Sequence, residues 1–241
     1  MLVSHPYQFI YLKTSKTAGT SIEMALQGAA FNQDPDQVKA ATHAQVGVRG
    51  VIGRRMIFNL SSKETAADKI WLPHMSAADL FDRVGERIWN RYDKVASVRN
   101  PFDRMVSNFH WRRTVRHEIK GHKVSTREIA ESGFDEIRSE FRDFIMSNDA
   151  IVDGETVMLN GKFCITKAIR YEHLREDLIR VAKELELDEN RLRIPETLVS
   201  KHLRHGHSVA DYYDQSTVEQ VKKRMFWAFE KFGYPEKPGD Q

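Results

Sequence analysis

The sequence predicts an α/β fold, a three-layer sandwich in which a central, mainly parallel sheet is flanked by helices. Three times along the chain a short apolar run of strand formers leads into a segment with the apolar stripe of a helix. The strand candidates are Phe9–Leu12, Val95–Val98 and Phe163–Arg170. Strands that alternate with helices are typical of parallel sheets. With 241 residues, the chain can form one well-buried domain.

The first strand-to-helix corner carries residues suited to binding an anion. After Phe9–Leu12, a helical stripe is formed by Ile22, Ala25, Leu26 and Ala29. A helix that begins in such a turn exposes its first N–H groups and the positive end of its dipole. The turn also offers one ammonium group and several hydroxyl and backbone donors, in the order Lys16, Thr17, Ala18, Gly19, Thr20, Ser21.

This turn differs from the P-loop of nucleotide hydrolases. There the lysine follows the second glycine, whereas here Lys16 precedes the only glycine of the turn, Gly19. The pattern therefore predicts a phosphate cradle of another kind within a P-loop-like fold. An ordinary corner with a surface lysine is the alternative.

The second corner has a well-marked helix start. Val95–Val98 is the strand, Asn100 is a good N-cap, and Pro101 suits the first helical position. The expected core stripe of the helix is Phe102, Met105, Val106 and Phe109.

Arg99 closes this strand at the carboxyl edge of the sheet, where open parallel sheets bind ligands. Arg104 and Ser107 share a helix face, which we expect to point away from the core stripe. Two such corners predict two phosphate sites, which would suit a nucleotide with phosphates at both ends. Alternatively, Arg99 is a salt-bridged strand end and Ser107 a residue of the helix surface.

Composition excludes several classes of protein. The single cysteine, Cys164, cannot form an intrachain disulfide, and we expect it to be a buried thiol. A net charge of +3 does not indicate a nucleic-acid-binding protein. The histidines near residue 205 lack a carboxylate or cysteine pattern for a metal. Without a signal peptide or an apolar run of membrane-spanning length, we expect a cytoplasmic protein with no membrane span.

Other segments are less informative. Gln37–Arg55 suggests a helix or an irregular excursion over the sheet edge, and Met56–Leu60 and Lys69–Leu72 are possible strands. Ser76 could cap a helix, which places His74 just before a helix start, where a strand would end. The basic residues after Trp111 form either a solvated helix face or a wall that attracts an anionic acceptor.

Later in the chain, residues 132–145 and 216–232 have helical patterns, and residues 149–162 suggest a hairpin or loop.

Taken together, these motifs resemble the sulfotransferases that use 3'-phosphoadenosine 5'-phosphosulfate (PAPS), in particular bacterial-type soluble members of the carbohydrate sulfotransferase branch. The resemblance rests on Lys16-Thr-Ala-Gly-Thr-Ser and Arg99-Asn-Pro-Phe-Asp-Arg-Met-Val-Ser107, supported by Tyr171-Glu-His-Leu and by Phe-Gly-Tyr at 232–234. It implies a single sulfotransferase domain over residues 1–241, in which residues 112–162 are an acceptor-side insertion.

The resemblance also implies roles for individual residues. The turn from Lys16 to Ser21 would hold the 5'-phosphosulfate, with Lys16 also catalytic, and Arg99 and Ser107 would hold the 3'-phosphate. His74 matches the position of the catalytic base in glycan 2-O-sulfotransferases of this family. A loop near the C-terminus would bring Lys201 and Arg204 against the nucleotide.

The implied reaction is in-line transfer of a sulfuryl group from PAPS to an acceptor hydroxyl, on a saccharide or glycolipid, which leaves adenosine 3',5'-bisphosphate. No metal is required, and an anionic saccharide is a candidate partner. A nucleotide or small-molecule kinase is the alternative enzyme, although the Gly-Lys-Thr/Ser order is missing. An inactive nucleotide- or glycan-binding module is a third interpretation, which the role of His74 would test. Neither the acceptor nor the oligomeric state follows from the sequence.

Overall fold

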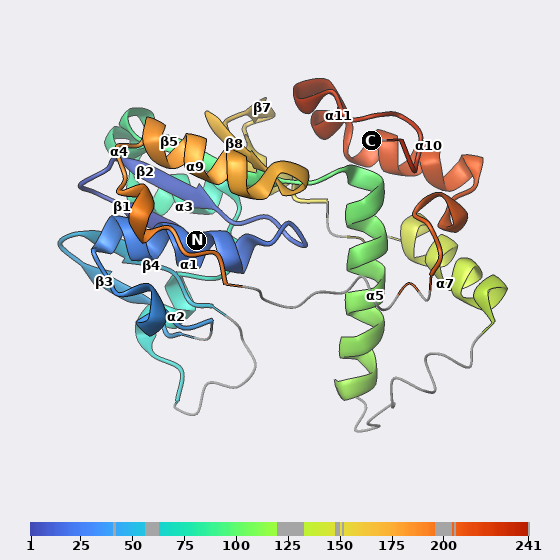
Figure 1. Cartoon of the computed structure of the whole chain (residues 1–241), viewed down its shortest axis with the longest axis horizontal. Helices are drawn as coiled ribbons and strands as arrows, with labels where there is room; N and C mark the ends of the chain where they lie inside the picture. Colours follow the sequence, from blue (N-terminus) through green and yellow to red (C-terminus); the bar gives the residue numbers. More distant parts are fainter. Residues whose placement is uncertain are drawn as a thin grey trace. The chain divides into compact units, whose positions relative to one another are not determined.

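The computed structural model describes residues 1–40, 42–55, 63–119, 133–147, 150, 152–195, 204 and 206–240. The chain divides into two compact units (Figure 1). Unit 1 comprises Met1–Val98 and Asp153–Thr197, and unit 2 comprises Arg99–Val152 and Leu198–Gln241. The chain therefore leaves unit 1 directly after Val98 and returns to it at Asp153.

Among the described residues, six strands of unit 1 form one sheet in the order β3-β4-β1-β2-β5-β8. Their bounds are β1 Leu2–Ser4, β2 Phe9–Leu12, β3 Gln45–Gly47, β4 Gly50–Ile52, β5 Asp93–Val98 and β8 Lys167–Arg170. The pairs β2–β5 and β5–β8 are parallel, whereas β1–β2, β1–β4 and β3–β4 are antiparallel. The sheet is thus mixed, because short turns join β1 to β2 and β3 to β4, and only antiparallel strands can be joined that way.

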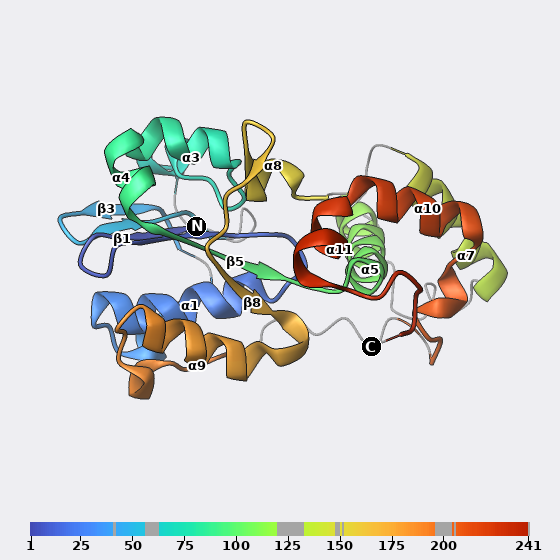
Figure 2. The same cartoon turned by 90° about the horizontal axis from the view of Figure 1, so that it is seen from above.

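Helices cover both faces of this sheet (Figure 2). Helices α1 (Gly19–Phe31) and α9 (Leu174–Glu184) lie on one face, and α3 (Ala77–Val84) and α4 (Glu86–Arg91) lie on the other. Apolar side chains of α1, α9 and the strands between them form a continuous buried cluster. The predicted α/β architecture with flanking helices is confirmed for unit 1.

Two predictions for residues 37–72 are wrong, and a third concerns residues that the structure does not describe. Gln37–Arg55 contains the edge strand β3 and its neighbour β4, not a helix or an irregular excursion. The predicted strand Lys69–Leu72 is wrong, because its first half belongs to helix α2 (Ala66–Ile70), which begins with a capping box between Thr65 and Asp68. The possible strand Met56–Leu60 lies outside the described residues.

The remaining elements of unit 1 are short. They are the 3-10 turns η1 (Pro35–Gln37), η2 (Tyr171–His173) and η3 (Glu189–Arg191), helix α8 (Gly154–Val157), and the strands β6 (Met158–Leu159) and β7 (Lys162–Phe163). The expected hairpin in residues 149–162 corresponds to β6 and β7. Its turn residues Asn160 and Gly161 both have positive φ, at 51° and 73°, as an Asn-Gly hairpin turn requires.

Unit 2 is helical in the part that the structure describes. It contains α5 (Pro101–Ile119), α7 (Phe134–Met146), η5 (Ala210–Tyr212), α10 (Gln215–Arg224) and α11 (Phe226–Phe232). Helix α5 begins as predicted, because the Asn100 side chain accepts a hydrogen bond from the Phe102 N–H at 3.0 Å. The helix expected at 216–232 is broken at Met225 into α10 and α11.

The first half of α5 is more deeply buried than the sequence suggests. Arg104 and Ser107 are only 1% and 2% exposed, so the expectation that they point away from the core is wrong. Arg104 donates to the carbonyl of Val152 at 3.3 Å and to the sulfur of Met225 at 3.7 Å. A buried guanidinium needs such partners, and those partners lie far from it in sequence.

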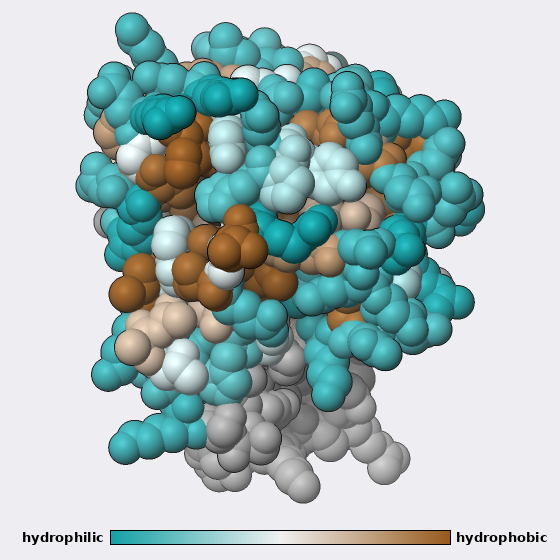
Figure 3. Space-filling view, turned by 90° about the vertical axis from the view of Figure 1, so that its left-hand side faces the viewer, coloured by the Kyte–Doolittle hydropathy of each residue, from teal (hydrophilic) through white to brown (hydrophobic). Residues whose placement is uncertain are grey.

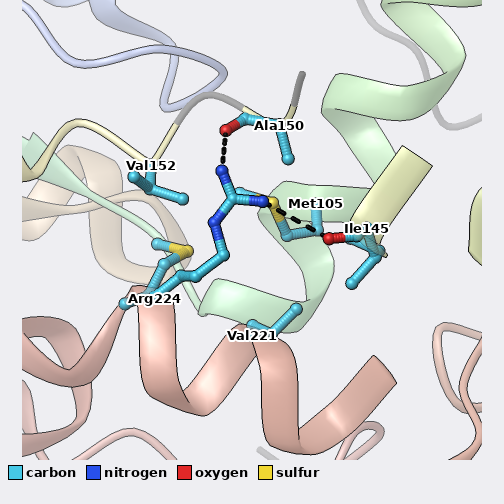
Figure 4. A pocket seen from close by; sticks show the side chains of 7 residues that line it. Met105, Ile145, Ala150, Val152, Val221 and Arg224 are labelled. Carbon is cyan, nitrogen blue, oxygen red and sulfur yellow. Dashed lines mark hydrogen bonds between the residues drawn. The ribbon is translucent and has the colours of Figure 1, made fainter. Parts of the chain in front are cut away.

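Arg224 of α10 fixes the end of α7 within unit 2 (Figure 4). Its guanidinium donates to the carbonyls of Ile145 and Ala150 at 3.3 and 2.8 Å, as Figure 4 shows, and to that of Ser147 at 2.9 Å. These carbonyls lie at and beyond the helix end, where backbone acceptors lack intrahelical partners. The small pocket drawn there is lined mainly by apolar side chains and by Arg224, and we assign it a structural role.

The face of the molecule in Figure 3 is mostly hydrophilic, with hydrophobic patches between the polar side chains. Large apolar side chains exposed in unit 1 include Val46, Val48, Ile70 and Leu72. Among the residues that the structure describes, no helix combines the length and apolarity needed to cross a membrane.

Candidate functional site

The turn between β2 and α1 has the backbone of an anion-binding loop. Lys16 and Ala18 both adopt left-handed conformations, with φ of 61° and 58°. Residues other than glycine rarely do so, and such strain is concentrated at functional sites. Left-handed residues next to residues of ordinary φ direct successive N–H groups into one concavity, which suits an anion.

The start of α1 offers further donors to the same concavity. Helix α1 begins at Gly19, and its N-cap Ala18 has no side chain able to bond the first N–H groups. No acidic residue occupies its first turn. Thr20 is half-buried and Ser21 is buried at this helix start. Helix N–H groups without a side-chain cap, together with the positive end of the dipole, form an anion site.

Gly19 lies where the chain is closely packed beneath the turn. A Cβ atom at this position would lie 3.0 Å from Cγ of Lys13 and 3.1 Å from the carbonyl oxygen of Thr14. The lysine stem therefore supports the helix start directly.

Hydroxyl groups tie the turn to the neighbouring strand β5. The Thr17 hydroxyl lies 2.7 Å from the Ser97 hydroxyl and 2.8 Å from that of Thr14. Thr14 donates to the Ser97 carbonyl at 2.5 Å, and the Tyr11 hydroxyl lies 2.9 Å from Ser97 Oγ. Because the Thr17 side chain is engaged in this buried network, its backbone N–H is the group that it can offer to a ligand.

A buried ion cluster lies behind the turn. Glu23 of α1 is fully buried, with its carboxylate 3.1 Å from the Lys13 ammonium and 3.9 Å from the Arg55 guanidinium. The N-terminal ammonium of Met1 lies 3.4 Å from the same carboxylate. Burial alone would raise the pKa of Glu23, but these positive neighbours outweigh it and hold the pKa below its usual value.

His74 lies beside the turn and not at the end of a strand. Its Nδ1 is 3.0 Å from the backbone carbonyl oxygen of Lys13. Because a carbonyl can only accept, Nδ1 must carry the proton, and the lone pair of the neutral ring is on Nε2. Within the described part of the chain, this is the one hydrogen bond of the His74 ring.

The electrostatic surroundings favour the neutral form of His74. Desolvation lowers its pKa, the charge of Lys13 lowers it further, and Asp153 opposes both. The His74 side chain is exposed to solvent, which weakens the effect of desolvation relative to that of the Lys13 charge.

The structure adds Asp153, which sequence reasoning missed. This residue is 8% exposed and has a left-handed φ of 51° just before α8. Its carboxylate accepts a hydrogen bond from the Ser15 N–H at 2.6 Å. In the sequence, Asp153 is followed by a glycine within the predicted hairpin or loop at 149–162. That local pattern does not reveal the contact, because 138 residues separate Asp153 from Ser15.

A second cluster forms in unit 2 around Asp103. The Asp103 carboxylate lies 2.6 Å from the Arg99 guanidinium and also pairs with Arg204. Burial would raise the pKa of Asp103, but the two guanidinium groups outweigh it and keep the pKa low. Asp103 holds both guanidinium groups in place, and its i, i+4 spacing from Arg99 was the available signal. Ser107 lies one turn further along α5, and Lys201 lies outside the described residues.

The other candidates have separate surroundings. The His43 ring is 2.5 Å from the buried Asp68 carboxylate in unit 1, and His110 is buried in unit 2, 2.8 Å from the Tyr212 hydroxyl.

Cys164 is half-buried and its thiol lies 3.2 Å from the Val157 carbonyl. Burial raises the pKa of this thiol to about 11, so it is unreactive at neutral pH. Among the described residues, no group of three His, Cys, Asp or Glu side chains could hold a metal.

Comparisons with known proteins agree with the sequence motifs. A model of the sulfotransferase family matches residues 1–235, which include nearly all of both units. Comparison with curated proteins and with solved structures gave no significant match. A match of this length includes the β2–α1 turn, His74 and the Asp103 cluster, and it favours sulfuryl transfer over the alternative of a kinase. The chain therefore belongs to the sulfotransferase family.

Proposed function

We propose that this protein transfers a sulfuryl group from PAPS to the hydroxyl group of an acceptor, with the β2–α1 turn holding the 5'-phosphosulfate. The observation that carries the proposal is the concavity formed by left-handed Lys16 and Ala18 and by the uncapped start of α1. Its donors match the oxygens of a phosphosulfate, and Lys16 brings a positive charge to it.

The proposed chemistry is a direct, in-line displacement. The acceptor oxygen forms a bond to sulfur while the bond from sulfur to the bridging phosphate oxygen breaks, and the electron pair of that bond stays on the leaving phosphate. Lys16 and the N–H groups of α1 stabilise the charge that develops on this oxygen. The released product is adenosine 3',5'-bisphosphate, and the side chains and backbone supply the positive charge without a metal.

His74 is the proposed base. Its Nε2 lone pair, fixed by the bond from Nδ1 to the Lys13 carbonyl, takes the proton of the acceptor hydroxyl. A positioned base of this kind contributes typically about 10²–10⁴-fold in rate. Because the pKa of His74 is lowered, the ring is neutral and ready to accept a proton at pH 7.

Arg99 is proposed to bind the 3'-phosphate of PAPS, with Ser107 and Arg204 assisting. Support comes from the Asp103 carboxylate, which orients the Arg99 and Arg204 guanidinium groups. A planar guanidinium held in this way can bind phosphate through two parallel hydrogen bonds.

The acceptor is proposed to be a saccharide or glycolipid hydroxyl. The basic residues that follow Trp111 in α5 support an anionic saccharide. A single catalytic domain over residues 1–241 and a cytoplasmic location remain predictions.

Calorimetric titration with adenosine 3',5'-bisphosphate, ATP and AMP tests the donor, each with and without Mg²⁺. We expect binding of the bisphosphate that is tighter than that of ATP or AMP and independent of Mg²⁺. Preference for ATP with Mg²⁺ would refute the proposal and restore the kinase interpretation.

Variants separate the binding roles. Arg99→Ala removes charge-assisted hydrogen bonds, and we expect it to weaken bisphosphate binding by about 10–100-fold. Lys16→Ala should abolish turnover. Lys39→Ala, which changes an exposed lysine outside the turn, is the matched control and should retain both properties. Unchanged bisphosphate affinity in Arg99→Ala would refute its assignment.

His74→Ala tests the base and distinguishes an enzyme from an inactive binding module. We expect lost turnover with retained bisphosphate binding, and His173→Ala, another exposed histidine of unit 1, serves as the control. Full activity of His74→Ala would move the role of base to another residue, such as His43 or His110.

A further inference from the structure

Two charged residues of unit 1 lie near His74, because the His74 ring bonds the carbonyl of Lys13 and the Asp153 carboxylate bonds the N–H of Ser15, two residues further along the same turn. Lys13 directly follows β2 and is 4% exposed, whereas Asp153 precedes α8 and is 8% exposed. Neither residue belongs to the phosphate motifs of the sequence. Charged side chains this deeply buried are uncommon unless they are paired, so their presence beside one histidine calls for a physical explanation.

Lys13 bonds the His74 ring through its backbone carbonyl, while its side chain is buried in the interior. Its carbonyl accepts the Nδ1–H of His74 at 3.0 Å. Its ammonium is held 3.1 Å from the buried carboxylate of Glu23, and its stem lies beneath Gly19. The positive charge of Lys13 therefore has a fixed position relative to the imidazole that its own carbonyl orients.

Asp153 contacts the proposed phosphate-binding turn through its side chain. Its carboxylate takes the Ser15 N–H at 2.6 Å, which fixes its position on the turn. A negative charge here repels an incoming anion, and the left-handed backbone of Asp153 is itself strained. Two unfavourable features at one residue of a functional site suggest that its charge has a use.

The charges that act on His74 oppose one another. Lys13 disfavours a proton on the ring and Asp153 favours one. The N-terminal ammonium of Met1, whose nitrogen lies 3.4 Å from the carbonyl of Pro73, acts in the same sense as Lys13. Of these three charges, Lys13 and Asp153 have the larger effects on the pKa of His74, and the N-terminal ammonium has the smallest.

We propose that Asp153 is a positioning residue that works against Lys13 to set the proton affinity of His74. Lys13 keeps the imidazole neutral before transfer, and the Asp153 carboxylate stabilises the imidazolium that exists after Nε2 has taken the acceptor proton. A base needs both conditions, since it must start unprotonated and must still attract the proton in the transition state. The proposal deepens the proposed function and rests on it for the role of His74.

The first test measures the proton affinity of His74 itself. Imidazole resonances are followed by NMR against pH in the full chain, and the His74 signal is assigned by its loss in His74→Gln. We expect Asp153→Asn to lower the His74 pKa by about 0.5–1 unit and Lys13→Met to raise it by a similar amount. Asn keeps an oxygen that can accept the Ser15 N–H, and Met keeps the apolar stem under Gly19, so charge is the main change in each variant.

Two further variants keep the test decisive. Asp153→Glu retains the charge and should leave the His74 pKa near that of the wild type, even if the turn is disturbed. Asp82→Asn removes an exposed carboxylate from α3 and should leave both the His74 pKa and the activity unchanged. Shifts of the same sign in Asp153→Asn and Lys13→Met, or no shift in either, would overturn the proposal.

The pH dependence of turnover separates this inference from the proposed function. The acid limb of kcat/KM should move in the same direction as the NMR value, downward for Asp153→Asn and upward for Lys13→Met. If the NMR values shift as expected while His74→Ala keeps full activity, the opposed charges are supported and the base assignment fails. If His74→Ala is inactive while the NMR values do not shift, the base stands and the role of Asp153 is refuted.

Discussion

The buried carboxylate of Glu23 gives the sharpest prediction about stability. It neutralises the Lys13 ammonium at 3.1 Å and the Arg55 guanidinium at 3.9 Å. With an effective dielectric constant of about 20, these separations correspond to attractions of about 5 and 4 kcal/mol, before the cost of burying the ions. Glu23→Gln removes the attraction but leaves both cations buried, so the desolvation cost persists.

We expect Glu23→Gln to lower the free energy of unfolding by about 3–5 kcal/mol, the range found when one partner of a buried ion pair is removed. For a chain of this size the melting temperature should fall by roughly 6–20 °C. Urea unfolding followed by circular dichroism at pH 7 measures the change. Glu186→Gln, at an exposed glutamate of unit 1, is the control and should stay within about 0.5 kcal/mol of the wild type.

The pH dependence provides a second check on the same residue. The pKa of Glu23 is lower in the folded protein than in the unfolded chain. Its contribution is therefore present above the unfolded pKa, near 4.5, and is lost as the pH falls below that value. The difference between wild type and Glu23→Gln should narrow in acid. A difference below about 1 kcal/mol at pH 7, or one that does not narrow, would refute the account.

Three further predictions concern the turn and its base. Gly19→Ala places a Cβ atom 3.0 Å from Lys13 Cγ, so we expect the free energy of unfolding to fall by about 1–3 kcal/mol and bisphosphate binding to weaken. Gly47→Ala, where the added Cβ meets open space, is the control and should be neutral in the same melting and titration assays. Thr17→Val removes a hydroxyl 2.7 Å from Ser97 Oγ, which should lower the free energy of unfolding by about 1–2 kcal/mol and weaken bisphosphate binding. Thr17→Ser keeps a hydroxyl, and equal behaviour of the two variants would contradict the hydrogen-bond network. The lowered pKa of His74 predicts that kcat/KM falls in acid only below pH 6.5, as the ring takes up a proton, and an acid limb centred above pH 7 would exclude it as the base.

Local sequence signals predicted the two corners well. The strand Phe9–Leu12 is β2, and a helix follows the turn as expected. Asn100 and Pro101 mark the start of α5 correctly. These features depend on residues within a few positions of one another, so capping and periodicity are sufficient to predict them.

Predictions failed where a segment depends on partners far along the chain. Strands β3 and β4 are three residues each, too short for a periodic pattern, and they extend the sheet because β4 pairs with β1. Arg104 and Ser107 were expected on an outer face of α5, but both are buried. Side-chain spacing gives the faces of a helix, but it does not say how many of them will be covered.

The sequence by itself determined the sulfotransferase family, the α/β class, and the order of anion turn, histidine and arginine along the chain. Only the tertiary structure revealed the left-handed backbone at Lys16 and Ala18, the bond from His74 to the Lys13 carbonyl, and the contact of Asp153 with the turn. The physical reason is the range of the interactions. Strand, cap and helix preferences act between neighbours in sequence, whereas hydrogen bonds and charges act between neighbours in space, and His74 and Asp153 reach the turn across 61 and 138 residues.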